Sequence, residues 1–116
     1  MRYISFYRPA AGMSGRPDPE HMAEMAALGE REMKAGRLLM MGALLPAGRG
    51  LRVRRANGAV TAQEGAGPEA FGQGCGFAIL QAKDEADQRA QIEEFLSIAG
   101  DGECILVPLM EGPPPQ

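Results

Sequence analysis

The alternation of apolar and polar positions predicts a strand, a helix and a second strand within residues 74–110. Residues 76–80 form a short apolar run behind a glycine, which is typical of a strand buried on both faces. Asp84 is a candidate helix N-cap, Gly100 ends the helix, and residues 103–110 form the second apolar strand. The apolar residues between them recur at the spacing of one helical face and are Ile92, Phe95, Leu96 and Ala99.

The first seven residues alternate in the way that a strand requires. Ile4 and Phe6 point to one face of this predicted strand. Tyr3, Ser5 and Tyr7 point to the other. We expect the apolar face to lie in a core beneath helices. The face with two phenols and a hydroxyl suits a wet cavity, so its three residues are candidate ligand-binding residues; the alternative is that they pair across a dimer interface.

A helix is predicted next, and its ends carry residues with known capping preferences. Asp18 is a typical N-cap, Pro19 suits the first helical position, and Gly36 ends the helix. One face carries Met22, Met25, Ala26, Gly29 and Met33. We interpret the methionines as core filler rather than as a cofactor-binding motif. Because glycine weakens a helix by about 1 kcal/mol relative to alanine, we expect Gly29 to mark close packing against the sheet.

A strand over residues 37–45 and a β-hairpin follow. Asn57 and Gly58 form the strongest local hairpin signal, since both residues accept positive φ. The predicted register places Arg55 opposite Val60 and Arg54 opposite Thr61. Residues 64–74 are rich in glycine and lack periodicity, so we expect a loop there.

Length and composition indicate one globular domain. We predict the domain over residues 1–111 and a flexible proline-rich tail over residues 112–116. The net charge of −3 gives no electrostatic support for binding nucleic acid. No apolar run approaches the roughly 18 residues of a membrane span, and the first residues lack the pattern of a signal peptide. We therefore expect a cytoplasmic protein without nucleic-acid or membrane partners.

The sequence offers no set of metal or cofactor ligands. Cys75 and Cys104 are too few for a disulfide framework and favour buried thiols in a reducing cytoplasm, with a disulfide between adjacent strands as the alternative. One histidine and two dispersed cysteines suit metal ligation poorly. The glycines of residues 65–76 lack the lysine and the helix of a phosphate loop. We expect no cofactor and no metal, so an acid–base enzyme would have to be cofactor-free.

The order of predicted elements is strand, helix, strand, hairpin, strand, helix, strand. Without the hairpin this order is βαββαβ, so the predicted class is α+β with a ferredoxin-like plan and an inserted β-hairpin. Such a sheet carries both helices on one face and leaves the other bare. A second copy of the chain is the simplest cover, and we expect a homodimer, a dimeric α/β barrel, with the sheets facing each other around a cavity.

Several stretches resemble the YCII-related superfamily, and within it the branch named for a DGPF motif. They correspond to its first strand, its first helix exit and second strand, its hairpin and its last two strands. The similar stretches are residues 1–7, 35–38, 42–46, 51–54, 60–61, 74–80 and 107–111. The resemblance covers nearly the whole chain and implies a ferredoxin-like dimer.

The chain departs from the family at the named motif itself. After Thr61 the family places Asp-Gly-Pro-Phe, whereas residues 62–64 here are Ala-Gln-Glu. Residues 66–69 (Ala-Gly-Pro-Glu) resemble a displaced remnant that lacks the acid. Glu64 and Glu69 are the candidate substitutes for the missing Asp.

His21 is the only histidine and the candidate catalytic residue. Its position is similar to that of the histidine of YCII-like relatives, in some of which a His–Asp pair is proposed as catalytic. The helix N-terminus favours a neutral imidazole that can act as a base. Asp18, Glu24 or the distant Asp101 are candidates to orient it. The alternative is a solvated surface histidine.

Arg52 and Arg54 are the remaining candidate ligand-binding residues. They share one face of a predicted strand, and guanidinium groups suit the recognition of a carboxylate. The alternative is a solvated hairpin whose charges discourage pairing between sheet edges.

Two functions follow from these observations. The first is a dimer that binds a small organic molecule in its cavity, with His21-assisted acid–base chemistry as an added activity. The second is a non-catalytic interaction or regulatory module, since the resemblance includes members linked to sigma factors. The first requires His21 to meet Tyr3, Ser5 and Tyr7 at a pocket.

Overall fold

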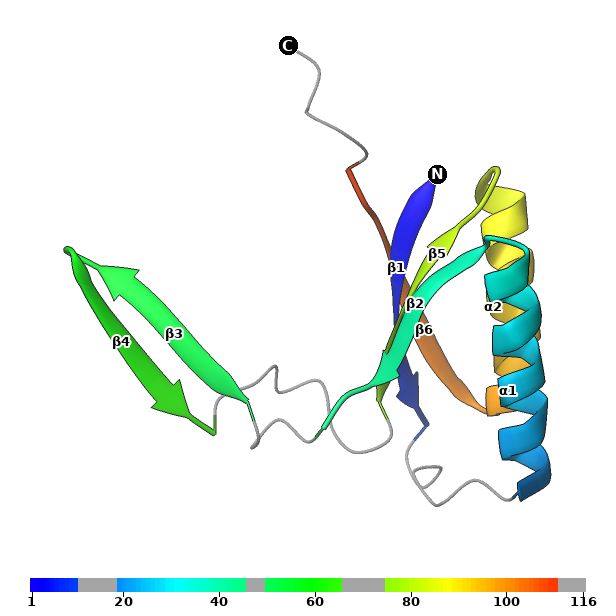
Figure 1. The fold of residues 1–116 in the computed structure, drawn as a ribbon, viewed down its shortest axis with the longest axis horizontal. Coiled ribbons are helices and arrows are strands. Elements are labelled where there is room, and N and C mark those ends of the chain that lie inside the picture. The colour runs from blue at the N-terminus through cyan, green and yellow to red at the C-terminus, as the bar shows by residue number, and fades with distance from the viewer. Residues whose placement is uncertain (11–18, 46–49, 66–74, 111–116) are drawn as a thin grey trace, which may run out of the picture.

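Four antiparallel strands form the sheet around which the chain is built (Figure 1). The computed structural model describes residues 1–10, 19–45, 50–65 and 75–110. The strands are β1 (Arg2–Pro9), β2 (Leu38–Ala43), β5 (Gly76–Gln81) and β6 (Gly102–Pro108). They lie in the order β2-β5-β1-β6, and each neighbouring pair is antiparallel. With two helices on this sheet, the predicted α+β class is confirmed.

Both helices, α1 (Pro19–Lys34) and α2 (Glu85–Ala99), lie on the same face of the sheet and pack against each other (Figure 1). The predicted end of α1 is confirmed, because Gly36 has a φ of 74°, in the region that glycine adopts easily. The predicted N-cap of α1, Asp18, lies outside the described residues, as does the tail over residues 112–116.

The predicted start and end of α2 are confirmed. The Asp84 carboxylate accepts a 2.8 Å hydrogen bond from the backbone N–H of Asp87 and so caps the first turn. Gly100 has a φ of 94°, and its N–H donates to the carbonyl of Leu96. These caps satisfy backbone groups that have no partner within the helix.

The predicted hairpin is also confirmed, and it forms a separate two-stranded sheet from β3 (Leu51–Ala56) and β4 (Ala59–Glu64). Asn57 (φ 51°) and Gly58 (φ 77°) occupy its turn, as a type I′ turn requires. The register is the predicted one, with Arg55 opposite Val60 and Arg54 opposite Thr61. Every residue of both strands is exposed, and the hairpin extends away from the four-stranded sheet (Figure 1).

The two faces of β1 are reversed relative to the prediction. Tyr3 and Ser5 are 0% and 5% exposed and lie on the helix side of the sheet. The buried core on that side comprises Tyr3, Leu38, Leu80 and Ala82. The phenol of Tyr3 is accommodated there because its hydroxyl donates a hydrogen bond to Gln91 of α2. Ile4 and Phe6, which were expected beneath the helices, point to the opposite face.

That opposite face is apolar, and the helices leave it uncovered (Figure 1). In the register, Ile4 stands opposite Ile79 and Val107, and Phe6 stands opposite Phe77 and Ile105. Met40 of β2 stands opposite Ile79. We term this surface the open face, and its residues are Ile4, Phe6, Met40, Phe77, Ile79, Ile105 and Val107. Met40 and Ile105 are 54% and 53% exposed, so much of this apolar surface faces water.

Both cysteines are free thiols, so the alternative of a disulfide between adjacent strands is not realised. Cys75 is buried and Cys104 is partly buried. Neither described helix has the length and apolar character that crossing a membrane requires.

Candidate functional site

A cavity of about 1020 Å³ lies between the two helices and the helix side of the sheet. This volume is at the upper end of small-molecule sites, which are roughly 300–1,000 Å³. The wall is mostly apolar, and its apolar side chains include Met22, Met25, Met33, Met41, Ile92 and Phe95. The methionines of α1 therefore line a cavity instead of filling a core. Unbranched methionine side chains adapt to irregular shapes, so this wall can adjust to an occupant.

The surroundings of Gly29 show that α1 is not packed tightly on the sheet at this position. A Cβ added to this glycine would have one neighbour within 4 Å, the Sδ atom of Met41 at 3.4 Å. That is an ordinary contact with a flexible side chain. The prediction that Gly29 marks close packing of the helix on the sheet is therefore wrong, and α1 leaves room beneath it.

Three residues predicted for a site, Ser5, Tyr7 and His21, line this cavity. Ser5 and Tyr7 alternate along β1 on the helix side of the sheet, whereas His21 comes from the first turn of α1. The cavity thus brings together polar side chains from two elements against a mostly apolar wall. The ligand-binding hypothesis requires His21 to meet Tyr3, Ser5 and Tyr7 at a pocket of a dimer; the structure brings three of these four residues together, and it does so within one chain.

The phenol of Tyr7 is held in a defined orientation. Its ring packs edge-to-face on Phe95, with the ring centroids 5.2 Å apart and the planes at 81°. Burial, together with the nearby Cys104 and Cys75, raises the pKa of Tyr7, so its hydroxyl is a neutral hydrogen-bonding group at pH 7. Burial likewise raises the pKa of the Cys104 thiol, which a hydrogen bond with Ser5 partly offsets.

His21 joins the start of α1 to the end of α2. Its Nε2 donates a hydrogen bond to the backbone carbonyl of Ile98, in the last turn of α2. Carbonyls of the last turn have no partner within the helix, so the imidazole helps to satisfy this helix end. Because a carbonyl only accepts, Nε2 must carry a hydrogen, and a general base would have to be Nδ1. The ring is also half-buried, so His21 is not a freely solvated surface residue.

Tyr3 does not reach the cavity, and its partner Gln91 is a residue that the sequence analysis missed. The Tyr3 hydroxyl donates to Oε1 of Gln91 at 2.7 Å, deep in the core. Gln91 lines the cavity and is 6% exposed. The signal was present, because Gln88 and Gln91 lie one turn apart beside the apolar Ile92 of α2. Polar residues on an inward helix face predict buried hydrogen-bond partners.

Arg52 and Arg54 lie elsewhere. Both are exposed on β3, and neither is among the described residues that line the cavity. The structure therefore does not bring them to His21, and a role in binding a ligand stays a prediction for the hairpin alone.

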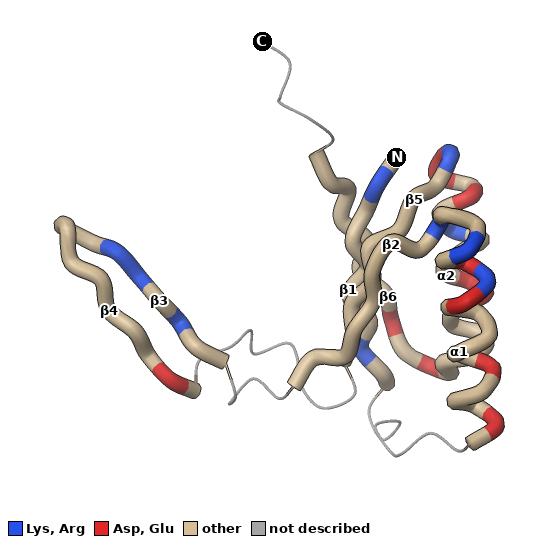
Figure 2. Tube along the Cα trace, viewed as in Figure 1, with Lys and Arg blue, Asp and Glu red and all other residues tan. Residues whose placement is uncertain are grey.

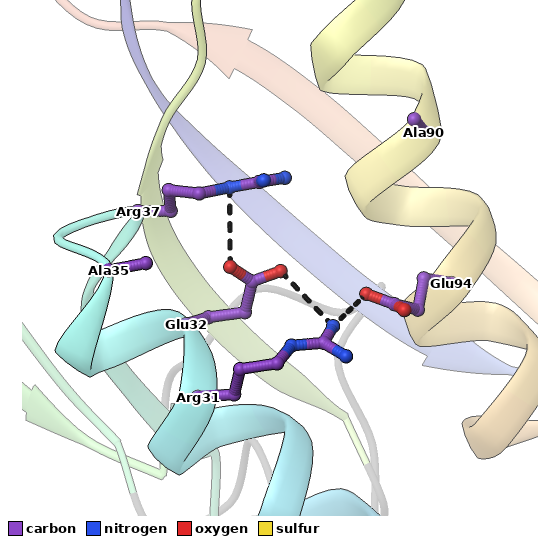
Figure 3. A pocket seen from close by; sticks show the side chains of 6 residues that line it. All are labelled: Arg31, Glu32, Ala35, Arg37, Ala90 and Glu94. Atoms are coloured by element: carbon purple, nitrogen blue, oxygen red, sulfur yellow. Dashed lines mark hydrogen bonds and ion pairs between the residues drawn. The ribbon is translucent and has the colours of Figure 1, made fainter.

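A second, polar pocket of about 400 Å³ lies where the end of α1, the start of β2 and α2 meet (Figure 3). Glu32 is its central residue, with Arg37 Nε at 3.2 Å from one carboxylate oxygen and Arg31 at 3.5 Å from the other. Arg31 also pairs with Glu94, and Arg37 lies 3.5 Å from Asp87. Positive and negative groups alternate here, so the pocket is a clamp between the helices rather than an anion site.

Metal ligands do not gather in the parts of the chain that the structure describes. No group of three or more His, Cys, Asp or Glu side chains there could hold a metal ion. The uncharged polar groups at the cavity include the imidazole of His21, the hydroxyls of Ser5 and Tyr7, the amide of Gln91 and the buried thiol of Cys75, which suit hydrogen bonding to an organic molecule.

Comparisons with known proteins do not assign the chain to a family. No protein-family model matches it, and no curated protein matches it. The resemblance to the YCII-related superfamily therefore stays a prediction.

Proposed function

We propose that the protein binds a small, uncharged and largely apolar organic molecule in the cavity beneath α1. The observation that carries this proposal is the convergence of Ser5, Tyr7 and His21 on a cavity of about 1020 Å³ with mostly apolar walls. Apolar walls with a few placed polar groups are the usual composition of a small-molecule site. The hydroxyls of Ser5 and Tyr7 would orient one polar group of the ligand, while the methionines enclose the rest.

The charges around the cavity favour an uncharged ligand. Lys34 is paired with Glu30 at 3.0 Å, and Glu32 is paired with Arg37 at 3.2 Å. A carboxylate or an ammonium brought into the apolar space would lose its hydration. The opposite charges nearby are already matched in these pairs, so they would not compensate for that loss. Acid–base catalysis by His21 stays a prediction that would use Nδ1.

We further propose that the chain forms a homodimer through the open face. Seven apolar side chains on one exposed surface are more than a monomer usually presents, and a second copy is the simplest cover. Two sheets facing each other would give the dimeric α/β barrel. The strand order β2-β5-β1-β6 with β3–β4 between β2 and β5 supports a ferredoxin-like plan with an inserted hairpin.

Membership of the DGPF branch of the YCII-related superfamily belongs to the same proposal and is supported by that element order. The two free thiols favour a reducing compartment, the cytoplasm. The second candidate function is a non-catalytic interaction module, which the open face and the exposed hairpin favour. A link to sigma-factor regulation rests on the resemblance alone.

Binding of two matched fluorescent probes tests the ligand proposal. N-phenylnaphthylamine is neutral, and anilinonaphthalene sulfonate carries the same ring system with an added sulfonate. We expect saturable binding of the neutral probe at one site per chain, with a rise in melting temperature, because a ligand that binds only the folded state stabilises it. We expect markedly weaker binding of the anionic probe. Stronger binding of the anionic probe would contradict an uncharged ligand.

Two alanines on α1 provide a matched pair of variants. Ala26 lines the cavity, whereas Ala23, one turn earlier on the same helix, is not among the described lining residues. Both are exposed, so leucine at either position should preserve the fold. We expect Ala26→Leu to weaken binding of the neutral probe and Ala23→Leu to leave it unchanged. Equal affinities for the two variants would place the probe outside the cavity.

A further inference from the structure

The β3–β4 hairpin has two chemically different faces. Residues directly opposite each other share a face, so the register divides the side chains. One face carries the apolar Leu51, Val53, Val60 and Ala62 with the charged Arg55 and Glu64 at its two ends; the other carries Arg52, Arg54, Thr61 and Gln63 with the small Ala56 and Ala59. Leu51 and Val53 are each 59% exposed, and Val60 is 65% exposed. A hairpin of two strands is marginally stable by itself in water, so this apolar face needs a cover.

The hairpin also differs in charge from the rest of the chain. Residues 51–64 contain three arginines and one glutamate, so the net charge of −3 divides into +2 on the hairpin and −5 on the remainder. Figure 2 shows the basic residues along β3 and acidic residues on both helices. The hairpin is therefore complementary in charge to the body of this same chain, which favours their association.

The hairpin is a separate sheet that lies apart from the body of its own chain, on the side where a second copy would sit. The hairpin extends on the side of the sheet that bears the open face, away from the helices (Figure 1). The radius of gyration is 16.6 Å, against roughly 13 Å for a compact domain of this length. A copy that covered the open face would thus lie next to the extended hairpin.

We propose that the hairpin is an assembly arm whose apolar face packs on a second copy of this chain. This inference rests on the proposed dimer and adds that the hairpin β3–β4 stabilises it. Arg55 lies on the same face as Val53 and Val60, so it would be carried to the same surface of the other copy, whose residues outside the hairpin have a net charge of −5. In a two-fold symmetric dimer each chain gives one arm and receives one, so every contact occurs twice.

Sedimentation velocity of the full chain over a concentration series tests the arm. The variant Val53→Ser/Val60→Ser removes apolar surface, and the matched control Thr61→Ser/Gln63→Ser alters the other face of the same hairpin. All four residues are exposed, so the fold of the body should not change. We expect the apolar-face variant to raise the dimer dissociation constant about 100-fold or more. Each of the two arms in the dimer would lose the burial of two valine side chains. The control should leave it unchanged.

A variant of the open face separates failure of the arm from failure of the dimer. Ile105→Asp places a charge on an exposed position of β6 and should give a monomer. A monomeric wild type would overturn both proposals. A dimer that Ile105→Asp dissociates, but that the two hairpin variants leave equally strong, would overturn the arm alone.

Hydrogen exchange distinguishes an arm on a second copy from an arm folded back on its own chain. We expect amides of residues 51–64 to be protected in the wild-type dimer and to lose protection in the monomeric Ile105→Asp variant. Equal protection in the two proteins would mean that the hairpin is stabilised within one chain, and the proposal would be wrong.

Discussion

The hydroxyl of Tyr3 donates a 2.7 Å hydrogen bond to Oε1 of Gln91, and the amide of Gln91 donates in turn to the backbone carbonyl of Gln81 at 2.9 Å. Tyr3 is 0% exposed and Gln91 is 6% exposed, so these contacts are shielded from water. They connect β1 to α2, and α2 to the end of β5. Each group in such a buried chain depends on its neighbour for a partner.

Replacing Tyr3 with phenylalanine should lower the free energy of unfolding by about 1–3 kcal/mol, because Oε1 of Gln91 would be left buried without this donor. Urea denaturation measures the loss. The double variant Tyr3→Phe/Gln91→Leu should lose less than the sum of the two single losses, since the residues are direct partners. Strictly additive losses would contradict coupling between them.

Stability at alkaline pH should also depend on Tyr3. Burial, and then the negative charge of Asp87, raise the pKa of Tyr3 above its ordinary value of 10.0. The unfolded chain releases this proton near pH 10, whereas the folded chain retains it, so the unfolded state binds fewer protons above that pH. The contribution is therefore complete below about pH 10 and is lost as the pH rises further.

Urea denaturation between pH 8 and pH 12 measures this contribution. Burial also raises the pKa of Tyr7 and Cys104, so some decline should remain in every variant. We expect the free energy of unfolding of the wild type to fall more steeply above about pH 10 than that of Tyr3→Phe. Parallel curves for the two proteins would show that Tyr3 titrates alike in the folded and unfolded states.

Two glycine-to-alanine substitutions should have opposite effects. At Gly29 an added methyl would meet the Met41 Sδ atom at 3.4 Å, and alanine is the better helix former, so we expect a gain of up to about 1 kcal/mol. At Gly102 it would lie 2.6 Å from the backbone oxygen of Arg8 and 3.0 Å from Pro9 Cα. Backbone atoms cannot move aside as a side chain can, so we expect a loss of about 1–3 kcal/mol.

Thermal or urea unfolding of the two glycine variants checks this contrast. A loss of stability in Gly29→Ala would mean that the helix packs more closely than the cavity implies. An unchanged stability in Gly102→Ala would mean that β1 and β6 separate there without cost.

The clamp around Glu32 should matter more than an ion pair on the surface (Figure 3). The Glu32 side chain is 11% exposed and lies between Arg31 and Arg37, whereas the Glu30 side chain is 69% exposed and pairs with Lys34. We expect Glu32→Gln to cost about 1–2 kcal/mol, because two arginines lose a partly buried partner. Glu30→Gln, two residues earlier in α1, should change the free energy of unfolding by less than about 0.5 kcal/mol. Equal urea midpoints would contradict the distinction.

The local features of the fold could be read from the sequence because their causes are local. Asn57 and Gly58 adopt the positive φ values of the turn without help from distant residues. Their turn then fixes the register of Arg55 with Val60. The cap at Asp84 depends on a residue three positions later. Such contacts are specified within a few residues, whatever the rest of the chain does.

The orientation of β1 could not be read in this way. Both of its faces carry bulky side chains, and the choice between them depends on Gln91, which is 88 positions from Tyr3. Similarly, the apolar stripe of α1 indicated which side faces inward but not how far the helix stands from the sheet. That distance depends on how Met41 and the side chains of α2 meet the helix, and it determines whether a cavity exists.

The chain leaves β2 and enters β5 at points that already touch. Ala43 stands opposite Gly76, and the N–H of Leu44 donates a 2.9 Å hydrogen bond to the carbonyl of Cys75. The hairpin is thus inserted between two strands, β2 and β5, that are already paired where the insertion begins and ends. A two-residue turn in place of residues 46–73 should connect β2 directly to β5. The shortened chain should keep the sheet, both helices and the wall of the cavity. Such an excursion can change in sequence or length while the core keeps its shape, so the proposed assembly arm and the proposed ligand cavity could change independently of each other.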